Sequence, residues 1–144
     1  MSAKKTVLLV DDEYEFVAAL AERLEMRDLD VDSAPDGETA LVKAAERSFD
    51  AIVLDMAMPG MDGIETLKGL LQLNQDLQVI LLTGKATIPQ AVEAIKLGAL
   101  DLLEKPADID KLVEQIELAA SRKLELSHER IDETIKQIMA RKSW

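Results

Sequence analysis

The chain has 144 residues, which fits one domain with a short extension and argues against two full domains. Hydrophobic residues make up 48% and charged residues 31%, the balance of a globular protein, and only 3% aromatic residues leave an aliphatic core. The formal net charge is -11, but residues 121–144 hold six Lys and Arg against four Asp and Glu, so the acidic excess lies in residues 1–120. Because this part of the chain repels phosphate groups, nucleic acid is not expected as a direct ligand.

The chain has no Cys and a single His, His128. This excludes a disulfide framework, a thiol nucleophile, and a zinc site built from Cys or from a His cluster. The apolar run from Val7 to Val10 is closed by acidic residues and is too short for a signal peptide or a membrane-spanning helix. We therefore expect a cytoplasmic protein that does not bind membranes.

Five short runs rich in apolar and β-branched residues predict strands at 6–10, 29–33, 51–54, 78–82 and 101–103. The segments between them carry residues at helical spacing: Phe16, Leu20 and Leu24; Ala40, Leu41, Ala44 and Ala45; Ile64, Leu67, Leu70 and Leu71; Val92, Ile95 and Lys96. Asp36 and Gly37 precede the second predicted helix, Gly98 follows the fourth, and Asp108 is the predicted N-cap of the fifth.

This alternation of strands and helices predicts an α/β fold, a doubly wound parallel sheet covered on both faces. Such a sheet binds its ligands beyond the carboxyl ends of its strands. The polar residues that follow the predicted strands at that edge are Asp11, Asp12, Asp55, Thr83 and Lys105.

Three of these residues are carboxylates, which repel one another unless a cation lies between them. Oxygen ligands that leave room for water and phosphate suit Mg²⁺ better than a calcium cage built wholly from protein. A carboxylate can also accept a phosphoryl group as an acyl phosphate, and the transferred group then needs a metal ion, an ammonium and a hydroxyl or amide donor. Asp55, Lys105 and Thr83 offer such groups.

At this point the sequence resembles the receiver domain of bacterial two-component response regulators. The matching stretches are VLLVDDE at 7–13, VLDMAMPGMDG at 53–63, LLTG at 81–84 and GALDLLEKP at 98–106. The resemblance implies a flavodoxin-like sheet of five parallel strands in the order 2-1-3-4-5, with five helices and a C-terminal helical extension. We assign residues 1–121 to the receiver domain and 122–144 to the extension.

The resemblance also implies the roles of the strand-end residues. Asp55 is then the phosphoacceptor, and Asp11, Asp12 and Asp55 hold Mg²⁺ together with the backbone carbonyl of Ala57. Lys105 contacts the phosphoryl group, and its peptide bond to the following proline is cis. Pro59, Gly60 and Gly63 shape the loop beside Asp55.

Thr83 is expected to move its hydroxyl toward the phosphoryl group and so alter the face formed by the fourth helix, the fifth strand and the fifth helix. The family usually has Tyr or Phe where this chain has Leu102, and Leu102 cannot report the switch by turning a ring inward. The side chains at Ala57 and Lys85 are expected to tune the lifetime of the acyl phosphate.

The residues from Ser121 onward contain no Pro or Gly, so the fifth helix is predicted to continue. Leu124, Ile131 and Ile138 recur every seven residues, with Ile135 beside them. Either this helix packs back on the body or frays, or its apolar seam forms a dimer or binds another partner. His128 lies in a segment that faintly resembles the phosphoacceptor box of histidine kinases, but the usual Pro is missing, so we expect an exposed helical His.

These features predict a signalling phosphoacceptor and not an enzyme with a separate substrate. The expected partners are a sensor histidine kinase or phosphotransfer protein and a downstream output protein. A homodimer is a further possibility, either through the face of the fourth helix, fifth strand and fifth helix, called the switching face below, or through the C-terminal helix. A binding module that never uses phosphorylation keeps the same fold. An aspartyl phosphatase needs a second acid where Ala57 stands, and a flavin or nucleotide carrier needs a phosphate loop in place of the acidic DDEYE segment.

Overall fold

The structure is a computed structural model that describes residues 4–85 and 87–142. The strands are β1 (Thr6–Val10), β2 (Asp30–Ala34), β3 (Ala51–Asp55), β4 (Val79–Thr83) and β5 (Asp101–Glu104). The helices are α1 (Tyr14–Glu25), α2 (Gly37–Glu46), α3 (Gly63–Leu73), α4 (Ile88–Leu97) and α5 (Ile109–Arg141). Each predicted strand is present, with its ends displaced by at most one residue.

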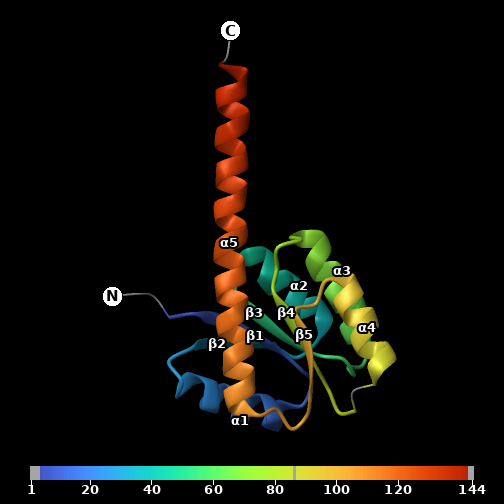
Figure 1. Cartoon of the computed structure of the whole chain (residues 1–144). Coiled ribbons are helices and arrows are strands. Elements are labelled where there is room, and N and C mark those ends of the chain that lie inside the picture. The colour runs from blue at the N-terminus through green and yellow to red at the C-terminus, as the bar shows by residue number, and fades with distance from the viewer. Residues whose placement is uncertain (1–3, 86, 143–144) are drawn as a thin grey trace.

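The five strands form one parallel sheet in the order β2-β1-β3-β4-β5 (Figure 1). This confirms the doubly wound, flavodoxin-like arrangement that the resemblance implies. In such a sheet the chain reverses its direction of winding between β1 and β3, which are neighbours at the centre. The carboxyl ends of β1, β3, β4 and β5 therefore face the same crevice.

Two apolar cores cover the two faces of the sheet, because successive side chains of a strand point to opposite sides. Leu8 and Val10 point into the core shared with α2, α3 and α4. Val7 and Leu9 point into the core shared with α1 and α5. Figure 1 shows these two helix layers on either side of the sheet.

The helix ends follow the sequence signals. The Asp36 carboxylate accepts a hydrogen bond from the Thr39 N–H at 2.7 Å, and Asp108 accepts one from the Asp110 N–H at 3.0 Å. Gly98 ends α4 in the left-handed conformation, with φ of 112°. The predicted cap at Asp108 and the predicted stop at Gly98 are therefore confirmed, and Asp36, predicted only to precede the second helix, is its N-cap.

The face that α4 buries differs from the one its apolar spacing suggested. Val92 and Ile95 are 45% and 49% exposed, whereas Ala94 is fully buried. Apolar residues surround more than one side of this ten-residue helix. The small side chain of Ala94 lets the helix backbone approach the sheet closely, and the larger residues are left at the surface.

Helix α5 runs for 33 residues, as the absence of helix breakers predicted. Its first turns bury Leu112, Ile116 and Ala119 against the sheet. Beyond them the helix projects past the body (Figure 1). No helix in residues 4–85 and 87–142 is long and apolar enough to cross a membrane.

Polar contacts hold one side of α5 to the body beyond its last buried residue. The Lys123 ammonium lies 2.6 Å from the Ser48 hydroxyl and 3.4 Å from the Asp50 carboxylate. About two turns further along the helix, the Arg130 guanidinium donates two hydrogen bonds to the Asp76 carboxylate. We refer to this second contact as the Asp76–Arg130 clamp.

The apolar seam lies on a different side of α5. Leu124, Ile131, Ile135 and Ile138 are exposed by 60%, 56%, 53% and 43%. At about 100° per residue these four positions lie roughly 110° around the helix from Ala119, Lys123 and Arg130, which contact the body. The seam therefore does not pack back on the body.

Candidate functional site

An acidic cluster lies at the carboxyl edge of the sheet, where the sequence placed it. Asp11 follows β1 and Asp55 ends β3, and both side chains are buried. Asp12 is exposed beside them. One carboxylate oxygen from each of these three residues lies within 4.8 Å of the others, a spacing at which one ion can touch all three.

Lys105 reaches into this cluster from the segment after β5. Its side chain is only 15% exposed, and its ammonium lies 2.8 Å from an Asp11 oxygen and 3.5 Å from an Asp55 oxygen. The backbone N–H of Lys105 donates to the Thr83 carbonyl at 2.7 Å, which fixes the residue beside the end of β4. The Lys105–Pro106 peptide bond is cis, as the resemblance implied.

The electrostatics of the cluster favour a further cation. Burial and the nearby Asp11 charge raise the pKa of Asp55 above its ordinary value, although Lys105 and the Ala57 N–H oppose them. Burial acts to lower the pKa of Lys105, but the surrounding carboxylates prevail and raise it. One ammonium thus leaves the buried carboxylates incompletely neutralised.

The donor set of this cluster fits a hard divalent ion. It consists of carboxylate oxygens from Asp11, Asp12 and Asp55, with no soft ligand among them. Two of these groups are buried and one is exposed, so the cluster is open to water on one side. Mg²⁺ typically binds one or two carboxylates and keeps several water ligands, which suits such an open cluster.

The other two predicted site residues lie at the same edge. The Ala57 N–H donates to Asp55 at 3.3 Å, so this backbone lies directly beside the carboxylate. The Thr83 side chain is buried, and its hydroxyl accepts a hydrogen bond from the Lys85 N–H at 3.4 Å. Leu102 is partly buried and packs against the core of α2, α3 and α4.

Two residues near Lys105 were not predicted as site residues. Glu13 places a carboxylate oxygen 3.5 Å from the Lys105 ammonium, and the centre of the Phe16 ring lies 4.4 Å from it. Both belong to the start of α1, immediately after Asp11 and Asp12. Glu13 and Phe16 are three residues apart, which puts their side chains on the same side of a helix. A helix predicted to start at Glu13 would have shown from the sequence that the two side chains lie together.

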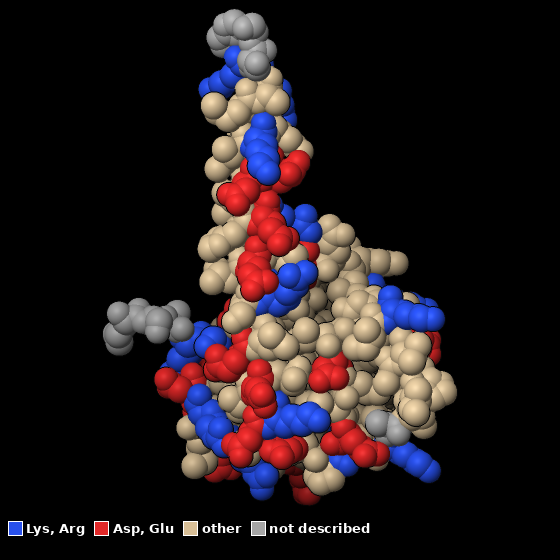
Figure 2. Space-filling model, viewed as in Figure 1, with Lys and Arg blue, Asp and Glu red and all other residues tan. Residues whose placement is uncertain are grey.

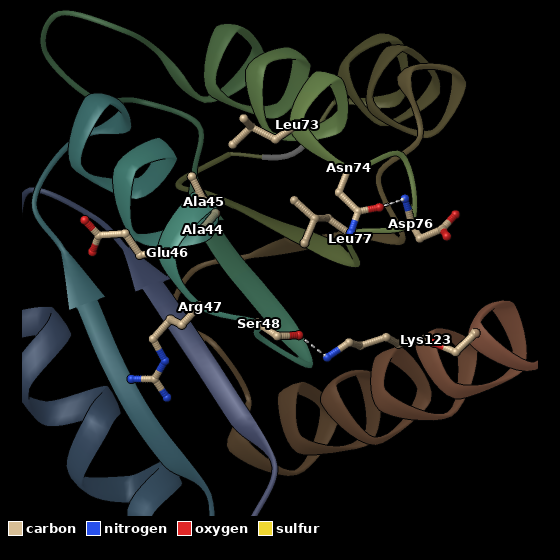
Figure 3. A pocket seen from close by; sticks show the side chains of 11 residues that line it. Ala44, Ala45, Glu46, Arg47, Ser48, Leu73, Asn74, Asp76, Leu77 and Lys123 are labelled. Atoms are coloured by element: carbon tan, nitrogen blue, oxygen red, sulfur yellow. Dashed lines mark hydrogen bonds between the residues drawn. The ribbon is translucent and has the colours of Figure 1, made fainter. Parts of the chain in front are cut away.

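A cavity of about 530 Å³ lies at the opposite edge of the sheet (Figure 3). It is lined by the segments that precede β3 and β4 and by α5, and the Lys123 ammonium reaches across to Ser48 beside it. No predicted site residue lines this cavity, and its lining mixes both charges with apolar groups. It is therefore separate from the acidic cluster.

A five-stranded parallel sheet in this order, with an acidic cluster and a lysine at its carboxyl edge, defines a flavodoxin-like α/β protein suited to a metal ion and phosphate. The family model described as "Response regulator receiver domain" matches residues 7–117. The chain belongs to this family, which confirms the resemblance found in the sequence.

Known proteins agree with this assignment. The chain is 36% identical over 123 residues to the C4-dicarboxylate transport transcriptional regulatory protein DctD of Rhizobium meliloti, and the match covers 85% of this chain but only 27% of that relative. The Francisella response regulator 1452 receiver domain has a TM-score of 0.78 and 32% identity, over 83% of this chain and 98% of that one.

A response regulator from Burkholderia pseudomallei, solved with a phosphorylated aspartic acid, calcium ion and citrate, is also similar. It has a TM-score of 0.74 and 29% identity, over 96% of this chain and 86% of that one. The match therefore extends to the phosphorylated form of a related protein.

Proposed function

We propose that this receiver accepts a phosphoryl group on Asp55 from a phosphohistidine on a sensor kinase or phosphotransfer protein. A carboxylate oxygen of Asp55 attacks the phosphorus, the phosphorus–nitrogen bond breaks, and the imidazole of the donor leaves. The observation that carries the proposal is the position of Asp55, which is buried between Asp11 and the Lys105 ammonium at the carboxyl edge of the sheet.

The residues around Asp55 take complementary roles in this proposal. Asp11, Asp12, Asp55 and the Ala57 carbonyl hold Mg²⁺, which when bound neutralises charge on the transferred group. Lys105 pairs with the phosphoryl oxygens. The Burkholderia relative, which carries a phosphorylated aspartic acid and a calcium ion, supports this chemistry.

The output of the phosphorylated state is a protein contact. Thr83 turns its hydroxyl from the Lys85 backbone toward the phosphoryl group and so moves the start of α4. The face of α4, β5 and α5 then changes its shape for an output protein. Exposed Ile88, Val92 and Ile95 on α4 give this face an apolar surface. We place this exchange in the cytoplasm, and the chain acts as a signalling phosphoacceptor and not as an enzyme with a separate substrate.

Intact-mass measurement with a small-molecule phosphodonor tests the proposal. With Mg²⁺ present, the wild-type chain is expected to gain one phosphoryl group, and with a chelator the labelling is expected to be at least about 100-fold slower, because the charge on the transferred group is no longer neutralised. A related receiver labelled in parallel controls for the donor. Absence of any adduct on the folded chain would instead favour the binding module that never uses phosphorylation.

We further propose that the receiver domain comprises residues 1–121 and that residues 122–144 are its extension, which is helical to Arg141; residues 1–3 and 143–144 lie outside the described residues. The family match ends at residue 117, and Ala119 is the last fully buried residue of α5. Figure 2 shows acidic side chains interspersed with basic ones along the projecting part of this helix. The apolar seam lies on another side of it.

The seam is proposed to pair with the same seam of a second copy, in a two-stranded coiled coil. Its heptad spacing suits such a pair, and Lys123 and Arg130 hold a different side of α5 against the body, so the seam stays uncovered. This makes the C-terminal helix, and not the switching face, the first candidate for a homodimer.

The Ile135→Asp variant tests this pairing, because a carboxylate in the seam would be buried without a partner. We expect it to weaken the dimer by about 100-fold or more, measured by sedimentation equilibrium. Leu118→Asp is the matched control, since Leu118 is exposed to a similar extent, 51% against 53%, but lies off the seam. A wild-type chain that remains monomeric at high concentration, or a dimer that tolerates Ile135→Asp, would contradict the pairing.

A further inference from the structure

The ammonium of Lys105 is held by more than its ion pairs. Asp11, Asp55 and Glu13 surround it with carboxylate oxygens at 2.8, 3.5 and 3.5 Å. Its remaining side is covered by the aromatic ring of Phe16, whose centre lies 4.4 Å away. A cation within about 6 Å of a ring face is attracted by the electron density of the ring, most strongly where water is excluded.

Phe16 is fixed by the fold and not by Lys105. It lies in the first turn of α1, where the Val17 N–H donates to the Glu13 carbonyl at 3.0 Å. Its ring is half-buried and packs against the core of α1 and α5. The ring is therefore a rigid surface built into the helix, and the flexible lysine side chain lies against it.

The shortest contact of Lys105 is with Asp11 and not with Asp55, although its proposed partner is a phosphoryl group on Asp55. The ammonium must therefore turn its N–H donors from one carboxylate toward the other. Attraction to a ring face does not depend on which way the N–H bonds point, so it persists during this turn. A carboxylate in the place of the ring would accept a hydrogen bond and so fix the direction in which the N–H bonds of the ammonium point.

We propose that Phe16 is a positioning residue for phosphorylation: its ring holds the Lys105 ammonium beside Asp55 while the ammonium exchanges its carboxylate partners. The inference rests on the proposed role of Lys105 in phosphoryl transfer. It adds a residue of α1 to a site otherwise built from the segments at the ends of the strands.

The substitution Phe16→Leu tests the proposal, because it removes the ring and keeps an apolar side chain in the core. We expect the rate of phosphorylation by a small-molecule phosphodonor to fall roughly three- to tenfold, and Phe16→Tyr to restore most of it. Phe49→Leu is the matched control. Phe49 is buried beneath Arg47 with a ring-to-guanidinium distance of 4.8 Å, away from the site, so its loss should lower the melting temperature and leave the rate unchanged.

A double-mutant cycle separates positioning from packing. If the ring acts through the ammonium, Phe16→Leu has no further effect on the rate in a Lys105→Ala background. An equal loss in both backgrounds, or a wild-type rate for Phe16→Leu, would overturn the proposal. If Lys105→Ala itself retains the wild-type rate, the proposed function of Lys105 fails instead, so the two failures are distinguishable.

Nuclear magnetic resonance gives a readout that does not depend on phosphorylation. The ε-methylene signals of Lys105 are expected to be shifted upfield by the ring in the wild type and in Phe16→Tyr, and to lose this shift in Phe16→Leu. This measurement decides the outcome if the rate of Lys105→Ala is too low to measure. Unshifted signals in the wild type would overturn the proposal.

Discussion

The Asp55→Asn variant is expected to take up no phosphoryl group and to be more stable than the wild type in the absence of divalent ions. The amide of Asn cannot form the acyl phosphate, so labelling falls to background. Asn retains an oxygen that can accept the Ala57 N–H, so the local backbone is preserved. The same substitution removes a buried charge that Asp11 repels.

The sign of the stability change follows from the pKa of Asp55. In the folded protein this pKa lies above its ordinary value of 3.8, mainly because of burial and the Asp11 charge. The folded state therefore binds the Asp55 proton more tightly than the unfolded chain does. The wild type loses stability as the pH rises from below 3.8 through the folded-state pKa, and Asn avoids this loss.

Thermal unfolding at pH 7 in a chelator is the measurement, and we expect the Asn variant to melt a few degrees above the wild type. The Asp32→Asn variant is the control with the opposite sign. Burial acts to raise the pKa of Asp32, but Lys43, the Ser33 N–H and Arg47 prevail and lower it. Asp32→Asn should therefore lower the melting temperature and leave labelling intact, whereas labelled Asp55→Asn would refute the assignment of the phosphoacceptor.

The Gly63→Ala variant is expected to be the most damaging small substitution near the site. A Cβ atom on Gly63 would lie 2.5 Å from the Cα of Met56 and 2.7 Å from the Asp55 carbonyl oxygen. These are backbone atoms at the end of β3, and the Gly63 N–H already donates to the Met56 carbonyl at 3.1 Å. The loop between β3 and α3 must move to admit the methyl group, and Asp55 moves with it.

We expect Gly63→Ala to cost about 2–3 kcal/mol of unfolding free energy, as overpacking against a rigid neighbour does. Displacement of Asp55 should slow its phosphorylation by roughly 10- to 100-fold. Urea unfolding and a labelling time course measure the two effects. Gly84→Ala is the control, because a Cβ atom there meets nothing within 4 Å and the backbone needs no positive φ. Equal behaviour of the two variants would contradict the expectation.

Much of the fold could be predicted because strands, helices and caps each leave a local signal. The apolar runs placed the strands to within one residue, and Asp36, Gly98 and Asp108 marked helix ends. The face of α4 could not be predicted in the same way. Val92 and Ile95 have the spacing of a buried face, but the fit of Ala94 against the sheet decides which side is covered, and this is a property of tertiary packing.

The candidate site was predictable where it depends on topology. Parallel strands bring their carboxyl ends together, so Asp11, Asp55 and Lys105 could be grouped before any coordinates were known. The contribution of Phe16 could not be found this way, because its spacing with Leu20 and Leu24 indicates only a core face. Its place beside the ammonium depends on where α1 begins and on how it leans against the sheet.

The Asp76–Arg130 clamp sets how freely the far end of α5 can swing. With the clamp closed, the unsupported arm comprises residues 131–141, about 16 Å of helix. When the clamp opens and Lys123 also releases the body, the arm begins after Ala119 and is about 33 Å long. The free arm is thus about twice as long once both contacts are lost, and the same bending of the helix moves its tip further. The clamp and the Lys123 contacts together thus determine how closely the end of α5 follows a tilt of the body.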